Sequence, residues 1–351
     1  MIDIALKGLG TALPQHRLSQ SEAFILARDM FQNRFSDFDR IAPVFANAGI
    51  DSRSIAMPLD WYLEPRGWDE RNKAYVDVAS QLFAQAARSA LAAADVPAAD
   101  IDAIITVSST GISTPTLEAR VAAELGFRPD VLRVPVFGMG CAGGLSGLAL
   151  GVQLARANTG GKILVVAVEL CTLSFRKDTL TKANIVSTAL FADGAAAAVL
   201  AAAQPDDRHI VGPGCQYTWP ATLHIMGWNV TSEGLEVVFD RDIPSFVRSR
   251  ISHVVHSFLE RLSLTHEDIA RFGFHPGGMK VLEALETALN IEPGSLDIER
   301  DILREQGNMS APTVLFVLDR LLANAPADGI NLLSALGPGF SAVSVPVTVR
   351  S

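Results

Sequence analysis

Short apolar runs alternate with amphipathic helical runs along nearly the whole chain, and this alternation constrains the fold more than any other feature. The expected helices are residues 75–94, 116–125, 144–157, 244–262, 279–289 and 310–323. The expected strands are residues 101–108, 131–136, 162–168, 195–200, 269–274, 329–335 and 340–349. Such alternation favours a sheet with helices on its faces. Because no Pro/Gly/Ser-rich linker interrupts it, we predict two fused α/β halves, residues 1–204 and 205–351.

The composition narrows the kinds of protein that this chain can be. The 351 residues are 49% hydrophobic with 27 glycines, which suits closely packed helices on a sheet. The formal net charge is −9 and no Lys/Arg block occurs, so we expect no nucleic-acid partner. Any phosphate-bearing ligand must then meet a local cluster of cations. The longest purely apolar run, residues 195–203, is far shorter than the ~20 residues of a membrane span, and no signal peptide is apparent. We expect a cytoplasmic protein without an integral membrane segment.

The three cysteines, Cys141, Cys171 and Cys215, point to chemistry at one position. Their odd number and wide spacing argue against a disulfide framework and against a metal site. Cys141 follows a predicted buried strand and a glycine-bearing turn, and it opens a helix rich in Ala and Gly. The backbone N–H groups at a helix N-terminus stabilise a thiolate and lower its pKa. Cys141 is therefore a candidate nucleophile, with a buried structural thiol as the alternative; the other two cysteines lack this setting.

A cysteine nucleophile needs a base and hydrogen-bond donors, which other parts of the chain must bring close in space. His275 ends an apolar run directly before a Pro-Gly-Gly turn, whereas the other six histidines lie in helices or polar surroundings. Asn308 precedes a predicted helix in which Ser310 is the expected N-cap and Pro312 lies in the first turn. An uncharged amide donor suits a developing oxyanion, although a turn or capping role for Asn308 is the alternative.

Five short motifs resemble one known family. They are GCAGG at 140–144, LFADGA at 190–195, HPGG at 275–278, GNMS at 307–310 and GPG at 337–339. Their order and approximate spacing are similar to those of the type III polyketide synthases, the chalcone synthase-like family. The resemblance implies a thiolase-like fold with layered αβαβα architecture, and a homodimer. It places the nucleophilic cysteine in the first half of the chain and the histidine and asparagine in the second.

The resemblance also implies a reaction, the iterative decarboxylative condensation of malonyl-CoA onto an acyl-CoA starter. Cys141 would carry the acyl group as a thioester. His275 would hold the thiolate in an ion pair and donate to the thioester oxygen, and Asn308 would share this donor role. The substrates are CoA thioesters, and neither a further cofactor nor a metal is expected, which agrees with the missing dinucleotide fingerprint and ligand spacing.

The substrate-binding residues follow from the same resemblance. Phe191 matches the family's gatekeeping phenylalanine. Cavity-lining positions fall on Thr110, Cys171, Ser174, Ser187, Val237 and Leu336. Val237 stands where chalcone-forming members have a second phenylalanine, which leaves room for a longer chain. The surroundings of Trp228 look like bacterial enzymes that make alkylpyrones or alkylresorcinols from fatty acyl starters. Arg53 falls near the family's CoA-phosphate cations.

Three other interpretations remain open from the sequence. A β-ketoacyl synthase III-like enzyme would share the cysteine and the fold but would take malonyl groups from a carrier protein. A hydrolase with a Cys-His-Asn triad would release an acid without CO2. A non-catalytic partner subunit would bind acyl-CoA and leave Cys141 unreactive.

Overall fold

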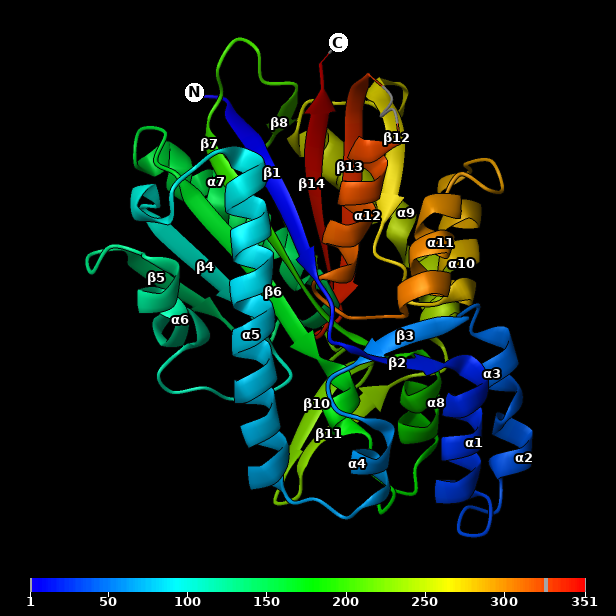
Figure 1. The fold of residues 1–351 in the computed structure, drawn as a ribbon. Coiled ribbons are helices and arrows are strands. Elements are labelled where there is room, and N and C mark those ends of the chain that lie inside the picture. The colour runs from blue at the N-terminus through cyan, green and yellow to red at the C-terminus, as the bar shows by residue number, and fades with distance from the viewer. Residues whose placement is uncertain (1, 325–327, 351) are drawn as a thin grey trace.

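The computed structural model describes residues 2–324 and 328–350, and a large mixed sheet organises them (Figure 1). Its strand order is β12-β13-β14-β8-β1-β7-β6-β4-β5, and β9 pairs with β14. The strands are β1 (Ile4–Ala12), β4 (Ala103–Val107), β5 (Leu132–Val136), β6 (Ile163–Leu170), β7 (Asp193–Ala202), β8 (His209–Val211), β9 (Cys215–Thr218), β12 (Ile269–Phe274), β13 (Gly329–Gly337) and β14 (Ser341–Val349). Two separate ribbons are β2 (His16–Ser19) with β3 (Ser52–Ile55), and β10 (Met226–Thr231) with β11 (Gly234–Phe239).

Helices pack on both faces of this sheet, one set between the strands of the two halves and the other on the outside. They are α1 (Gln20–Phe31), α2 (Phe38–Ile41), α3 (Pro43–Asn47), α4 (Leu59–Leu63), α5 (Trp68–Ala94), α6 (Leu117–Leu125), α7 (Gly143–Ala157), α8 (Lys182–Leu190), α9 (Ile243–Arg261), α10 (Met279–Leu289), α11 (Asp297–Gln306) and α12 (Thr313–Ala323). Helices α7 and α12 form a middle layer whose core includes strands from both halves of the chain. Helices α5 and α6 cover the outer face of the first half, and α9 and α10 cover that of the second. The predicted layered α/β architecture is confirmed.

Helix α7 can occupy the middle layer because its packing faces carry glycine. A Cβ atom added at Gly144 would collide with the backbone carbonyl oxygen of Ala311, just before α12. A Cβ atom at Gly151 would instead meet side-chain atoms, the nearest being the end of Leu200 at 2.7 Å. The backbone contact at Gly144 therefore sets the distance between α7 and the segment before α12.

Two of the sequence predictions need correction. The pattern predicts a buried strand before the nucleophile, but β5 is an edge strand with Leu132 53% exposed, and Pro135 suits such an edge. Helix α12 begins at Thr313 rather than at Ser310, and Ser310 has a left-handed backbone with φ of 60°.

One continuous sheet joins the two parts of the chain. Strand β8, which follows residue 204, pairs with both β1 and β14, so strands from the N-terminal and C-terminal regions share one set of backbone hydrogen bonds. Within the described residues no helix combines the length and apolar character that a membrane span requires.

The close approach at Gly144 gives a stability prediction. The Gly144→Ala variant should lose about 1–3 kcal/mol of unfolding free energy because the backbone must move to relieve the collision. Without the collision, alanine would stabilise a helix by ~1 kcal/mol relative to glycine. A decrease in unfolding free energy would therefore indicate the collision, and an increase would indicate its absence. Urea unfolding measures it, and Gly151→Ala serves as the control with a smaller loss. A Gly144→Ala variant more stable than the wild type would contradict the packing argument.

Candidate active site

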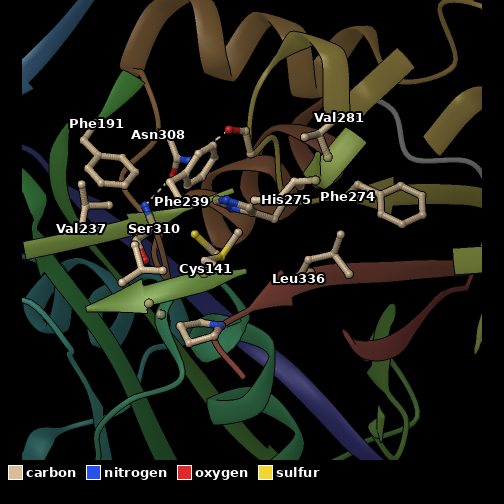
Figure 2. Close-up of a pocket in the computed structure, with 18 of the residues that line it drawn as sticks. Cys141, Phe191, Val237, Phe239, Phe274, His275, Val281, Asn308, Ser310 and Leu336 are labelled. Atoms are coloured by element: carbon tan, nitrogen blue, oxygen red, sulfur yellow. Dashed lines mark hydrogen bonds between the residues drawn. The ribbon is translucent and has the colours of Figure 1, made fainter. Parts of the chain in front are cut away.

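Cys141 lies in a one-turn 3-10 helix, Gly140–Ala142, immediately before α7. The turn is fixed from behind by Ser109, which follows β4. The backbone N–H groups of Gly138 and Gly140 donate to the Ser109 hydroxyl oxygen at 3.0 and 3.4 Å. Gly140 has φ of 46°, a conformation that glycine adopts without strain. This local geometry points the cysteine side chain away from the sheet and into a cavity (Figure 2).

His275 and Asn308 reach the same cavity from the second half of the chain. His275 follows the last residue of β12, and its backbone N–H donates to the Ser334 carbonyl of β13 at 2.9 Å. Asn308 follows α11, where its backbone pairs with the segment around Phe191. Its amide Nδ2 donates to the Gly277 carbonyl at 3.3 Å (Figure 2). The structure thus brings the three predicted catalytic side chains together from three distant segments.

The cavity is apolar except at this end. Its walls are Gly140, Phe191, Met226, Gly227, Trp228, Val237, Val238, Phe239, Ile243, Phe274, Gly277, Val281, Leu285, Ser310, Ser334, Ala335, Leu336 and Pro338. Phe191 and Trp228 meet edge to face with ring centroids 6.1 Å apart. The chemistry-bearing groups therefore gather at one point of a pocket that otherwise presents hydrocarbon.

The predicted substrate-binding residues fall into three groups. Phe191, Trp228, Val237 and Leu336 line the cavity that holds Cys141. Thr110 and Ser174 line a smaller cavity beyond Trp228, whose indole contributes to both. Cys171 and Ser187 are buried, only 1% and 2% exposed, and line neither of these cavities. The sequence assigns all of these residues to a cavity lining, whereas the structure distributes six of them over two cavities that Trp228 lines in common.

The prediction for Arg53 is wrong, because its side chain is completely buried. Its Nη1 donates to the backbone carbonyl oxygens of Thr188 and Phe191 at 3.0 and 3.3 Å. Burial lowers the pKa of Arg53 to about 9, and the Asp193 carboxylate partly offsets this. A guanidinium enclosed in this way has no access to the phosphates of an incoming ligand. Arg53 instead fixes the backbone on which Phe191 stands.

The pKa expected for Cys141 also needs correction. Burial raises the pKa of the thiol to about 11, although a hydrogen bond with the Ser310 side chain works in the opposite direction. Burial lowers the pKa of His275 to about 3, and neither ring nitrogen has a hydrogen-bond partner among the described residues. The resting pair is thus a thiol and a neutral imidazole, because desolvation outweighs the stabilisation that the following helix offers to a thiolate.

A buried carboxyl group, Glu169, supports the nucleophile turn from below. Its Oε2 accepts hydrogen bonds from the Ser109 backbone N–H at 2.9 Å and from the Thr110 hydroxyl at 2.8 Å. Its Oε1 is buried with no hydrogen-bond partner among the described atoms. Burial raises the pKa of Glu169 to about 7. Glu169 therefore links the serine and threonine residues after β4 to the strand β6 on which it lies.

Sequence reasoning missed the roles of Ser109, Glu169 and Ser310. The sequence places Ser310 at a helix cap, but its left-handed backbone lets its N–H donate to the Asn308 Oδ1 at 2.8 Å. Ser109 and Glu169 sit at the ends of strands that look purely structural in the sequence. The GNMS motif was the available signal for Ser310; no pattern in the sequence signalled the other two.

Glu169 gives a prediction about pH and stability. Its pKa is about 7 in the fold against an ordinary 4.5, so the folded state binds more protons than the unfolded state between these values. The stability that neutral Glu169 contributes is complete below pH 4.5 and is lost as the pH rises through 7. Glu169→Gln keeps one acceptor oxygen for Ser109 and Thr110 and cannot ionise. Its stability relative to the wild type should therefore increase by up to about 3 kcal/mol between pH 4.5 and 8, at ~1.4 kcal/mol per pKa unit.

Urea unfolding at several pH values tests this prediction. The control is Glu233→Gln, which removes an exposed carboxylate that takes no part in the nucleophile turn. This control should follow the wild type at every pH. A constant difference between Glu169→Gln and the wild type across the range would contradict the raised pKa.

The fold and the comparisons define the class of protein together. The structure matches the crystal structure of 1,3,6,8-tetrahydroxynaphthalene synthase from Streptomyces coelicolor A3(2), a bacterial type III polyketide synthase. The match covers 99% of each chain, with a TM-score of 0.93 and 26% sequence identity. The fold is therefore the thiolase-like fold of these enzymes.

Family models identify the chain more closely. Residues 64–205 match the N-terminal domain of the chalcone and stilbene synthases, and residues 213–345 match their C-terminal domain. The chain belongs to this family, and thus to the type III polyketide synthases, which are acyltransferases that use malonyl-CoA.

Two curated relatives support the same conclusion. A putative chalcone synthase of Bacillus subtilis (strain 168) is 37% identical, over 95% of each chain. A 1,3,6,8-tetrahydroxynaphthalene synthase of Streptomyces peucetius subsp. caesius is also 37% identical, over 95% of this chain and 89% of the relative. Members of this class work on CoA thioesters without a further cofactor. Among the described residues, no group of three or more His, Cys, Asp or Glu side chains could hold a metal ion.

Proposed function

We propose that the enzyme loads a fatty acyl group from CoA onto Cys141 and extends it with malonyl-CoA to an alkylpyrone or alkylresorcinol-type product. The observation that carries this proposal is the convergence of Cys141, His275 and Asn308 at the polar end of an otherwise apolar cavity. The membership of the chain in the chalcone and stilbene synthase family favours this reaction over the β-ketoacyl synthase III-like alternative.

The first step is the transfer of the acyl group to Cys141. The neutral imidazole of His275 accepts the thiol proton while the sulfur attacks the thioester carbonyl of the acyl-CoA, and the departing CoA thiolate takes a proton back. Burial raises the pKa of Cys141 and so opposes a standing thiolate. The same apolar surroundings suit the uncharged thioester that results, so the cavity stabilises the loaded state relative to an ionised resting state.

The second step is the decarboxylation of malonyl-CoA. As CO2 leaves, the electron pair of the broken bond forms an enolate whose oxygen needs hydrogen-bond donors. Asn308 is oriented for this role, because the Ser310 N–H occupies its Oδ1 at 2.8 Å and leaves Nδ2 as the group that donates. His275 supplies the second donor from its protonated ring nitrogen. Losing one such donor typically lowers the rate by about 10²–10³.

The new carbon–carbon bond then forms at the loaded cysteine. The enolate carbon attacks the thioester carbonyl on Cys141, and the sulfur leaves as a thiolate that takes up a proton from water. The extended chain is now a CoA thioester, which can load again. Phe191 borders the cavity, and its apolar ring disfavours the charged malonyl carboxylate and so assists its departure as CO2.

The walls of the cavity support a fatty acyl starter. Phe191, Trp228, Val237 and Leu336 present hydrocarbon surface to it, and Val237 occupies less space than an aromatic ring. An alpha-pyrone synthesis polyketide synthase-like protein of Mycobacterium tuberculosis is 28% identical over 96% of this chain. The relatives named 1,3,6,8-tetrahydroxynaphthalene synthase support a second candidate, a polyhydroxylated aromatic product.

A neighbouring cavity is suited to admit the CoA portion of the substrates. It shares Phe239, Ile243, Gly277 and Val281 with the catalytic cavity. Its lining also includes the cationic side chains of Arg40, Lys182, Arg241 and Lys280. In a protein with a net charge of −9, such a local cluster is the feature that a phosphate-bearing ligand requires. We assign the phosphate-binding role to this cluster in place of the buried Arg53.

A homodimer is part of the same proposal. Ile112, Leu132 and Phe137 are 52%, 53% and 61% exposed. Leu132 lies on the edge strand β5, and Ile112 and Phe137 line one cavity beside it. An apolar surface next to an exposed strand edge suits a second copy of the chain.

The reaction itself gives the first functional prediction. Purified enzyme with radiolabelled malonyl-CoA and a panel of starters should release CO2 and form labelled pyrones or resorcinols. The starters run from acetyl-CoA through long-chain fatty acyl-CoA to p-coumaroyl-CoA, and product should be greatest with medium or long alkyl chains. A Cys141→Ala variant of equal urea stability should form no product.

Three outcomes separate the alternatives. Naphthalene products from malonyl-CoA alone would favour the second candidate. Release of free acid without CO2 would indicate a hydrolase. A folded wild-type enzyme that forms neither CO2 nor product, and whose Cys141 does not become acylated, would contradict the proposal in favour of a non-catalytic role.

The cation cluster gives a second functional prediction. Replacing Arg241 and Lys280 together by alanine should raise the KM for malonyl-CoA about tenfold with little change in kcat, because two exposed charges each contribute up to ~1 kcal/mol. The effect should shrink as salt is added. The matched control replaces Arg248 and Arg250, two exposed arginines of α9 that do not line this cavity. Equal KM values in the two double variants would contradict the assignment.

A further inference from the structure

A buried carboxylate outside the cavity connects the two segments that deliver His275 and Asn308. Glu299, on α11, is completely buried. Its Oε1 accepts a hydrogen bond from the Phe274 backbone N–H at 3.1 Å, and its Oε2 accepts one from Arg271 Nη2 at 3.3 Å. Phe274 and Arg271 both belong to β12, the strand that ends just before His275. Glu299 therefore binds two points of that strand.

The position of this contact in the sheet explains why β12 needs it. Strand β12 stands at the end of the strand order, and among the described strands it pairs only with β13. The His275 N–H faces β13 and donates to Ser334, so the preceding N–H, that of Phe274, faces away from the sheet. Without Glu299, the buried N–H of Phe274, the residue directly before His275, would have no hydrogen-bond partner.

Glu299 lies on the helix that leads directly to Asn308. Helix α11 ends at Gln306, two residues before the asparagine. No hydrogen bond joins the His275 and Asn308 side chains to each other among the described residues. Neither His275 ring nitrogen has a hydrogen-bond partner among the described residues, and the contact from Asn308 Nδ2 to the Gly277 carbonyl is 3.3 Å. Backbone bonds hold each residue to its own neighbours, His275 to Ser334 and Asn308 to Leu190, and the contact between β12 and α11 adds a direct connection between the two segments.

We propose that Glu299 is a positioning residue for decarboxylation, which aligns His275 and Asn308 on a single thioester oxygen. This inference rests on the proposed function of those two residues. Two donors that share one oxygen must both lie within hydrogen-bond distance of it at the same moment. A shift of β12 along or away from α11 would move one donor without the other, and it would weaken the enolate stabilisation that requires both.

A second buried glutamate provides a matched control. Glu286, on α10, is 7% exposed and accepts hydrogen bonds from the backbone N–H groups of Gly294 and Leu296. It also pairs with Arg300 at 2.6 Å, as Glu299 pairs with Arg271. Its partners lie in the 294–300 segment and not on β12. Replacing Glu286 removes the same chemistry from the interior but leaves the β12 contact in place.

The test is a double-mutant cycle with Asn308→Ala, read as CO2 release from labelled malonyl-CoA. Glu299→Met should slow release about a hundredfold in the wild-type background, as expected for a displacement of ~1 Å at a reacting group. In the Asn308→Ala background it should slow release less than about fivefold, because the alignment has already lost one member. Glu286→Met should have the same small effect in both backgrounds.

A correction for the folded fraction and a further variant separate a change in the reaction rate from a loss of folded protein in the double-mutant cycle. Rates are compared at equal folded fraction, determined by urea unfolding. Glu299→Gln keeps an acceptor oxygen for Phe274 and should retain about tenfold more activity than Glu299→Met, which is the upper range for a single ordinary hydrogen bond. If the methionine variant does not fold, the glutamine variant replaces it in the cycle, with an expected loss of about tenfold that disappears in the Asn308→Ala background.

The outcomes separate the inference from the function on which it rests. If His275→Ala and Asn308→Ala each release CO2 at the wild-type rate, the proposed function fails. If those variants are impaired while Glu299 and Glu286 substitutions act alike, or if the Glu299 effect is the same in both backgrounds, the positioning role fails and the proposed function stands.

Discussion

The site depends on a short backbone bridge between the two halves of the chain. The Asn308 N–H donates to the Leu190 carbonyl at 3.0 Å, and the Ala192 N–H donates to the Asn308 carbonyl at 2.9 Å. These two bonds fix Phe191 and Asn308 opposite each other. Arg53 strengthens the bridge from inside, because its guanidinium binds the Phe191 carbonyl. The Phe191 wall of the cavity and its amide donor are therefore held by one structural unit.

The same principle governs the other side of the cavity, where backbone groups rather than ion pairs set the geometry. Ser109 holds the turn that carries Cys141, and Glu169 holds Ser109 in turn. A buried charge close to the reacting thioester would be costly to desolvate, whereas hydrogen bonds to backbone N–H groups are retained throughout the reaction. Burial thus favours the uncharged forms of Cys141 and His275 while the donors stay fixed, which suits a reaction whose charge develops on one oxygen.

Much of the fold could be predicted from the sequence because strands and helices leave local periodicities. Residues 75–94, 162–168 and 279–289 carry strong apolar patterns, and the structure has α5, β6 and α10 there. The strands β2 and β3 and the helices α2, α3 and α4 were not predicted, because elements of four or five residues hold too few positions for a period. The edge position of β5 also escaped prediction, since exposure depends on which strands become neighbours.

The sequence by itself determined the family and the three residues that meet in the cavity, because Cys141, His275 and Asn308 each sit in a motif with turn chemistry of its own. The tertiary structure decided everything that depends on solvent access and on distance. It enclosed Arg53, raised the pKa of Cys141 through burial, and distributed the predicted lining residues over two cavities that share Trp228. It also placed Glu299 between β12 and α11. These properties arise between segments that are remote in sequence, and desolvation is a property of the packed interior rather than of any local pattern.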